Sequence, residues 1–189
     1  MAVSSTMVPL GTEAPDFRLP DLDGHERSLD ELAEGASALL VMFLCNHCPY
    51  VRHVEQGVAQ VVADYRDRGL VAVGICANDQ ERYPDDRPEG LREQAERAGF
   101  DFAYLLDADQ QVAKAYGAAC TPDFFLFDAD RRLAYRGQLD DSRPDSGEPV
   151  TGADLRAAID AVLDGRDAPE VQRPSIGCGI KWSPGNEPQ

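Results

Sequence analysis

The chain has 189 residues, enough to build a hydrophobic core without disulfide cross-links. Its 34 acidic residues outnumber 18 basic ones, and this net charge of -16 argues against nucleic acid or an anionic membrane as a partner, because clustered lysine and arginine bind phosphate groups. No apolar run approaches the roughly 20 residues of a membrane span, and the N-terminus lacks the basic start and apolar block of a secretory signal, so we expect a cytoplasmic protein.

The predicted elements alternate between strands and helices after a turn-rich start. Residues 20–32 indicate a loop or hairpin and then a helical turn that opens at Ser28 or Asp30. The apolar run at 36–44 is typical of a strand buried on both faces, and residues 50–69 carry apolar side chains at helical spacing. The later elements that we expect are, in order, a strand at 70–79, a helix at 87–99, a strand at 103–107, a helix at 110–117, two strands joined by a turn at 123–137, and a helix at 151–165 capped by Thr151.

This order of elements predicts an α/β fold with a central mixed sheet flanked by helices. We expect the early strands to be parallel and the last pair antiparallel, within one domain over residues 1–165. Residues 166–189 look like an irregular tail, but its apolar residues Ile176, Ile180 and Trp182 suggest that it docks on the domain. In such sheets the chemistry lies at the carboxyl ends of the strands, which points to the first strand-to-helix junction.

That junction holds two of the five cysteines, Cys45 and Cys48, in the stretch "CNHCPYV". An odd and unevenly spaced set of cysteines in a cytosolic chain favours catalysis or metal binding over structural disulfides. Because proline is favoured at the first position of a helix, Pro49 places Cys48 at a helix N-terminus, facing unpaired N–H groups and the positive end of the dipole. We therefore expect the pKa of Cys48 to lie below its ordinary value of roughly 8.5, with the Cys45 sulfur within bonding reach.

The blocks "CNHCPYV" and "ACTPDFFLFDADRRLAYRG" resemble the thioredoxin superfamily. They are most similar to its redoxin branch, which holds the peroxiredoxins (the alkyl hydroperoxide reductase/thiol-specific antioxidant group) and the cytochrome-maturation thioredoxins, and within it to members that bear the same two blocks. The resemblance covers residues 11–165 and implies a thioredoxin-like fold. It also implies that Pro122 is a cis-proline facing the reactive thiol, and that Thr121 offers main-chain groups to a bound thiol or peptide.

Two departures from the family pattern bear on the chemistry. Cys45 stands where peroxiredoxins carry the Thr or Ser that aids peroxide binding, and no arginine matches the one beside the peroxidatic thiolate. Cys120, close before the expected cis-proline, should face the same pocket. Cys178 in the tail can resolve an oxidised Cys48, as tail cysteines do in some peroxiredoxins, or it can be a free thiol on a loose tail. His47 can lower a thiol pKa, bind metal or point outward.

Two functions are open on the sequence alone. The first is a thiol–disulfide oxidoreductase, or an antioxidant thiol peroxidase, in which Cys48 attacks and Cys45 resolves the intermediate. Its substrates would be protein or small-molecule disulfides, thiols or peroxides, with a cellular reductant and no required cofactor. The alternative is a copper or zinc protein that holds metal through Cys45, Cys48, Cys120 and His47, because thiolates favour Cu(I) and Zn(II). A binding module without turnover is a third reading, against which the intact cysteine pair argues.

Overall fold

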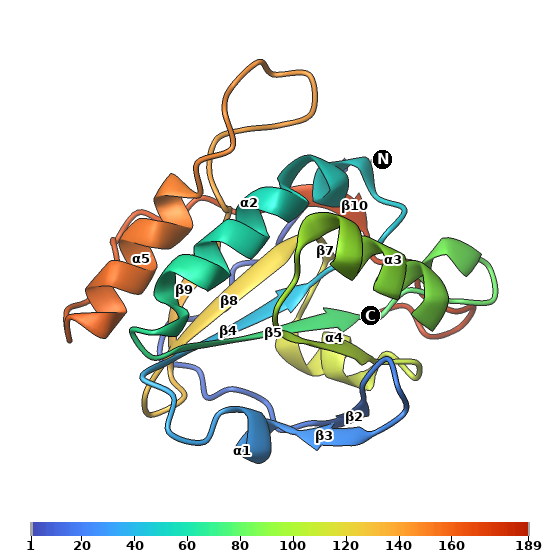
Figure 1. Cartoon of the computed structure of the whole chain (residues 1–189), viewed down its shortest axis with the longest axis horizontal. Coiled ribbons are helices and arrows are strands. Elements are labelled where there is room, and N and C mark those ends of the chain that lie inside the picture. Colours follow the sequence, from blue (N-terminus) through green and yellow to red (C-terminus); the bar gives the residue numbers. More distant parts are fainter. Residues whose placement is uncertain (1, 189) are drawn as a thin grey trace.

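Figure 1 shows the computed structural model of the protein, which describes residues 2–188. Its central sheet has five strands in the order β6-β5-β4-β8-β9. No helix within the described range combines the length and the apolar composition needed to cross a membrane. The strands are β1 (Ala2–Ser4), β2 (Arg18–Pro20), β3 (Glu26–Ser28), β4 (Ala38–Phe43), β5 (Leu70–Cys76), β6 (Ala103–Leu106), β7 (Cys120–Thr121), β8 (Asp123–Asp128), β9 (Leu133–Gly137) and β10 (Ile176–Gly179), and the helices are α1 (Leu29–Leu32), α2 (Pro49–Arg66), η1 (Pro84–Asp86), α3 (Pro88–Ala98), α4 (Gln111–Tyr116) and α5 (Ala153–Leu163).

The central sheet has the mixed topology that the sequence predicts. Strands β4, β5 and β6 run parallel, whereas β8 is antiparallel to both β4 and β9. Every residue of β4 is buried, because helices cover both faces of the sheet (Figure 1). Alternate β4 side chains serve two cores: Leu40 and Met42 pack with α2 and α5, whereas Val41 and Phe43 pack with α1 and α4.

The smaller elements follow the expectations with one difference. Strands β2 and β3 form a hairpin, and the Ser28 hydroxyl accepts the Glu31 N–H at 3.2 Å to cap α1. Helix α5 has Gly152 as its N-cap instead of Thr151, with the left-handed φ of 70° that favours glycine. The Asp140 carboxylate accepts the N–H groups of both Thr151 and Gly152 at 2.7 Å, which delays the start of the helix by one residue.

The C-terminal tail is not irregular throughout, because it contains strand β10. This strand lies in a second sheet of order β1-β10-β7, where Cys178 is opposite Thr121 and Gly179 is opposite Cys120. Ile180 is buried and Trp182 packs against the core. The tail therefore docks on the domain, as its apolar residues suggested, and it does so at the strand that leads into Pro122.

Candidate active site

Cys48 lies where the sequence places it, at the N-terminus of α2. The chain leaves β4 after Phe43, and Cys48 takes the extended N-cap conformation, with Pro49 as the first helical residue. Thr121 packs against both cysteines. The Cys48 sulfur lies 3.4 Å from the Thr121 carbonyl oxygen, to which it donates only while it is protonated, and the Cys45 sulfur is 3.2 Å from the Thr121 hydroxyl. The Thr121–Pro122 peptide bond is cis, as the resemblance implied.

The pKa of Cys48 is lowered to about 5, in the expected direction but for a different main reason. The largest contribution is a hydrogen bond from the Cys45 thiol, which outweighs the opposing effect of burial. The Cys178 thiol adds a second hydrogen bond, and the backbone N–H groups of Val51 and Cys178 add smaller ones. Hydrogen bonds from two neighbouring thiols and from the Val51 N–H in the first turn of α2 thus stabilise the thiolate together.

Cys45 is a much weaker acid than Cys48. Its pKa is raised well above the ordinary value, first by burial and then by its role as hydrogen-bond donor to Cys48. The negative charge of Asp86 raises it further. The two thiols therefore have distinct states near neutral pH: Cys48 is the anion, and Cys45 is the protonated partner beside it.

This difference predicts the titration of the reduced protein. We expect the ultraviolet absorbance of one thiolate to appear with a midpoint near pH 5, because the pKa of Cys48 is about 5. Since the unfolded value is roughly 8.5, the ionisation stabilises the fold fully above that pH, and this contribution is lost as the pH falls through about 5. Cys45→Ala should move the midpoint upward, whereas Cys76→Ala, which removes a buried thiol at the end of β5, should not. A midpoint at 8 or above in the wild type would contradict the assignment.

Two further cysteines lie on the strands next to the site, Cys178 on β10 and Cys120 on β7. Cys178 hydrogen-bonds to Cys48, and burial together with this bond raises its pKa to about 11. The alternative of a loosely held tail thiol is therefore wrong. Cys120 is fully buried, and its sulfur donates to the Pro122 carbonyl oxygen at 3.7 Å. Burial raises the pKa of Cys120, and the proximity of Cys48 and Cys178 raises it further.

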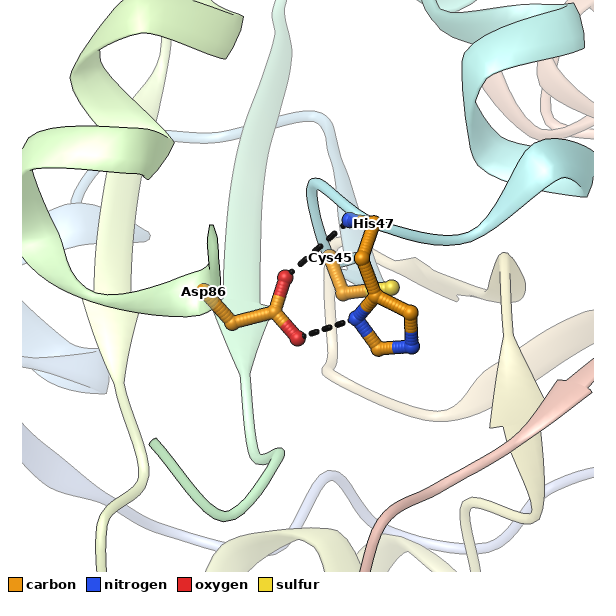
Figure 2. Close-up of side chains that lie close together, drawn as sticks. All are labelled: Cys45, His47 and Asp86. Carbon is orange, nitrogen blue, oxygen red and sulfur yellow. Dashed lines mark hydrogen bonds and ion pairs between the residues drawn. The ribbon is translucent and has the colours of Figure 1, made fainter. Parts of the chain in front are cut away.

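His47 does not point outward but pairs with a buried carboxylate beside Cys45 (Figure 2). Its Nδ1 is 2.6 Å from Asp86 Oδ2, and its ring stacks on Tyr83 with centroids 5.0 Å apart. Asp86 Oδ1 accepts the backbone N–H of Asn46 at 2.7 Å and that of His47 at 3.2 Å. Burial opposes ionisation of Asp86, but hydrogen bonds from His47 and Asn78 lower its pKa overall. Sequence reasoning missed Asp86, because its loop is rich in aspartate and proline.

The predicted metal-binding set is not brought together. Within residues 2–188, the groups of three or more potential ligands with donor atoms inside 4.8 Å are Cys45–His47–Asp86 and the more exposed Asp21–Asp23–His25. The first group holds Cys45 and His47 of the predicted set, but neither group contains Cys48 or Cys120. In the first group, Asp86 already accepts hydrogen bonds on both oxygens. His47 and Asp86 instead form a hydrogen-bonded pair, and Asp86 also accepts the backbone N–H groups of the strand-to-helix turn.

Asp86 should therefore be important for stability. We expect Asp86→Asn to lower the free energy of unfolding by about 2–4 kcal/mol, because it weakens charge-assisted hydrogen bonds to a fully buried group. Urea denaturation at neutral pH measures the change. The control is Asp85→Asn at the exposed neighbour, which should stay within about 0.5 kcal/mol of the wild type. Equal midpoints for the two variants would contradict this role.

Comparisons with known proteins agree with this geometry. Residues 10–136 match the AhpC/TSA family. A thiol-disulfide oxidoreductase, ResA, of Geobacillus thermodenitrificans is 25% identical over 128 residues, which are 68% of each chain. Peroxiredoxin Bcp of Escherichia coli is 26% identical over 137 residues, which are 66% of this chain and 82% of the relative.

Among solved structures, an uncharacterized conserved protein from Geobacillus kaustophilus is 52% identical, with a TM-score of 0.94 over 98% of each chain. A more distant one, a putative thiol:disulfide interchange protein DsbE from Chlorobium tepidum, is 20% identical with a TM-score of 0.65 over 83% of this chain and 99% of its own, and shows the fold alone. These comparisons give no support to the copper or zinc alternative. With the family match over residues 10–136 and a Cys45–Cys48 pair at the strand-to-helix turn, the chain belongs to the AhpC/TSA family and is a thiol-dependent oxidoreductase with a thioredoxin-like fold.

Proposed function

We propose that the protein is a thiol–disulfide oxidoreductase in which Cys48 is the nucleophile and Cys45 the resolving thiol. The observation that carries the proposal is the position of Cys48 at the N-cap of α2, with Cys45 beside it and both sulfurs against Thr121. This arrangement lowers the pKa of Cys48 to about 5 and raises that of Cys45. A thiolate at neutral pH is the reactive species in disulfide exchange. The Cys45 thiol, which hydrogen-bonds to that thiolate, already lies within reach of its sulfur.

The proposed cycle has two exchange steps. The Cys48 thiolate attacks one sulfur of a substrate disulfide, the substrate S–S bond breaks, and the departing thiolate takes up a proton. Cys45 then loses its proton and attacks the Cys48 sulfur, which forms the Cys45–Cys48 disulfide and releases the second substrate thiol. A cellular dithiol reductant returns both cysteines to thiols and is itself oxidised to a disulfide.

Thiol peroxidase activity is the second candidate, with an antioxidant role. It is favoured by the similarity to peroxiredoxin Bcp. In that case the thiolate attacks one peroxide oxygen, the O–O bond breaks, and the other oxygen leaves and takes up a proton to become water or an alcohol. Cys48, now a sulfenic acid, condenses with the Cys45 thiol to form the disulfide and release water, and the same dithiol reductant returns both cysteines to thiols. We rank it second because Cys45 replaces the expected threonine or serine and the peroxidatic arginine has no counterpart.

The other residues of the site have supporting roles in this proposal. Thr121 positions the two reactive thiols through its carbonyl and hydroxyl oxygens, and Pro122 continues the same wall. Cys120 and Cys178 are candidates for later relay steps. The cysteines supply the redox chemistry themselves, so the cycle uses no resident metal or cofactor. A reducing cytoplasm suits it, and all five cysteines are free thiols in this structure.

Mass spectrometry of the thiol state tests the proposal. After one molar equivalent of peroxide, we expect Cys48 to be the first cysteine oxidised and Cys45 to be recovered in disulfide linkage with it. Cys76, a fully buried thiol whose pKa burial raises, serves as the internal control and should remain a thiol. Oxidation elsewhere with Cys48 still reduced would refute the assignment. Metal analysis of the same sample, purified without chelator, would revive the alternative if it found stoichiometric copper or zinc.

A further inference from the structure

The strand edge beside Cys48 is occupied by the protein's own chain. Strand β7 ends at Thr121, whose carbonyl oxygen lies 3.4 Å from the Cys48 sulfur, and β10 pairs with β7 so that Cys178 is opposite Thr121. The other edge of β10 is covered by β1. Figure 1 shows β10 close to the first turn of α2, over the carboxyl end of β4. Both edges of β10 are therefore paired, and the edge of β7 that carries the Cys178–Thr121 pairing is not available to another strand.

The fit of β10 against this edge is close and is fixed on both sides. A Cβ atom at Gly177 would lie 2.0 Å from the Thr121 carbonyl oxygen, so only glycine allows the strand to approach so closely. Before the strand, the Ser175 hydroxyl donates to the Pro122 carbonyl oxygen at 2.7 Å. After it, the Ile180 N–H donates to the Ala119 carbonyl oxygen at 3.1 Å. β10 is thus an integral wall of the site.

The burial of the cysteines shows the effect of this wall. Cys45, Cys48 and Cys120 are each 0% exposed, and Cys178 on β10 is half-buried. The reduced nucleophile is therefore sealed from bulk solvent by side chains that include the strand's own cysteine. Small molecules can reach such a sulfur through local opening, but a folded or extended polypeptide needs far more space.

An extended polypeptide commonly binds by adding a strand to an open sheet edge, where main-chain hydrogen bonds supply affinity. Here β10 already uses the main-chain groups of β7. We propose, on the basis of the function proposed above, that the enzyme acts on small molecules with a disulfide or peroxide bond, and that β10 excludes polypeptide disulfides from Cys48. Both small substrate types react at the same thiolate by the balanced steps already given.

Two glycines of β10 allow a matched test in the full-length protein. In Gly177→Ala the new methyl group collides with the backbone of Thr121, so β10 must move away. In Gly179→Ala the new methyl group meets only the Val3 side chain at 3.3 Å, which can shift. The substrates are glutathione disulfide as the small probe and insulin as the polypeptide probe, with release of thiols as the measurement. Hydrogen peroxide consumption, measured in parallel, distinguishes the two kinds of small substrate.

We expect the wild type and Gly179→Ala to turn over a small probe and to leave insulin essentially unreduced. Gly177→Ala should gain insulin reduction by about tenfold or more, because the opening of the edge no longer limits access. Equal insulin reduction by the wild type and Gly177→Ala would overturn the inference. Failure of every protein on both small probes would instead count against the proposed function.

A second measurement keeps the inference testable if Gly177→Ala does not fold. In native protein that carries Cys178→Ser, iodoacetamide should alkylate Cys48, whereas a maleimide carried on a large polyethylene glycol should not. Cys178→Ser serves as the background, so that the half-buried thiol on β10 does not consume the reagents. Labelling of Cys48 at equal rates by the small and the large reagent would show that β10 is no barrier, whether or not the enzyme turns over a substrate.

Discussion

Replacement of Cys48 by serine should reduce turnover of a small disulfide by at least about 10³-fold, because a serine hydroxyl is not ionised at neutral pH and cannot replace a thiolate nucleophile. The fold should survive, because the two side chains are similar in size. Steady-state thiol release measures the loss, and circular dichroism checks the fold. Cys76→Ala is the matched control, since it removes a buried thiol that has no role in the proposed cycle and should leave turnover within about twofold of the wild type.

The companion change, Cys45→Ser, should stop the reaction one step later. Cys48 still attacks the substrate, but the resolving thiol is missing, so the mixed disulfide on Cys48 accumulates and appears as a mass adduct of the intact protein. The adduct should disappear on addition of dithiothreitol. Full activity in Cys48→Ser, or an adduct that maps to another cysteine, would refute the assignment of the nucleophile.

The second large effect concerns a buried ion pair next to the cis-proline. Arg136 and Asp123 are both 0% exposed, and an Arg136 Nη2 donates to Asp123 Oδ2 at 2.9 Å. The same nitrogen donates to the Gly117 carbonyl oxygen, and the guanidinium lies 4.2 Å from the centre of the Phe125 ring. Arg136→Met would leave the Asp123 carboxylate buried without its counter-charge. We expect the free energy of unfolding to fall by about 3–5 kcal/mol at neutral pH.

The control for this prediction is an exposed arginine in the turn before β9. Arg132 pairs with Glu13 at 3.6 Å on the surface, so Arg132→Met should lower the free energy of unfolding by less than about 1 kcal/mol.

The pH dependence of stability gives a further check. Burial raises the pKa of Asp123 to about 6 even beside Arg136, and the loss of that charge should raise it more. A carboxyl group whose pKa is raised in the folded state is protonated, and no longer a buried charge, at low pH. The loss in free energy of unfolding caused by Arg136→Met should therefore become smaller as the pH falls from 7 towards about 4. A difference in free energy of unfolding between Arg136→Met and the wild type that does not change with pH would contradict this explanation.

The sequence predicts those elements whose own residues show a pattern, such as an apolar run, helical spacing or a proline at a helix start. The apolar run of β4 and the helical spacing in α2 reflect burial that each segment shows by itself, and Pro49 marks the helix start that places Cys48. Strands β7 and β10 are two and four residues long, too short for a periodic pattern. Their pairing depends on Gly177 and Thr121, which lie far apart in the sequence, so the wall over the site was not predicted.

The electrostatics of the site were predicted only in direction. A cysteine before a helical proline signals a lowered pKa, but the larger contribution comes from the Cys45 thiol, with further help from Cys178. The His47–Asp86 pair joins residues 39 positions apart, from a loop whose neighbouring aspartates gave no sign of which would turn inward. Such contacts arise from tertiary packing, and local sequence patterns carry little information about them.

The pairing of β10 with β1 and β7 also has a consequence for biosynthesis. The central strands leave the ribosome well before residues 176–179, so a nascent chain can assemble its parallel core while the sulfur at the start of α2 is still uncovered. During that interval it lacks the donors that Cys178 provides. Until then, oxidants and the thiols of other chains can react with Cys48 in the nascent protein. This exposure ends when β10 pairs with β1 and β7.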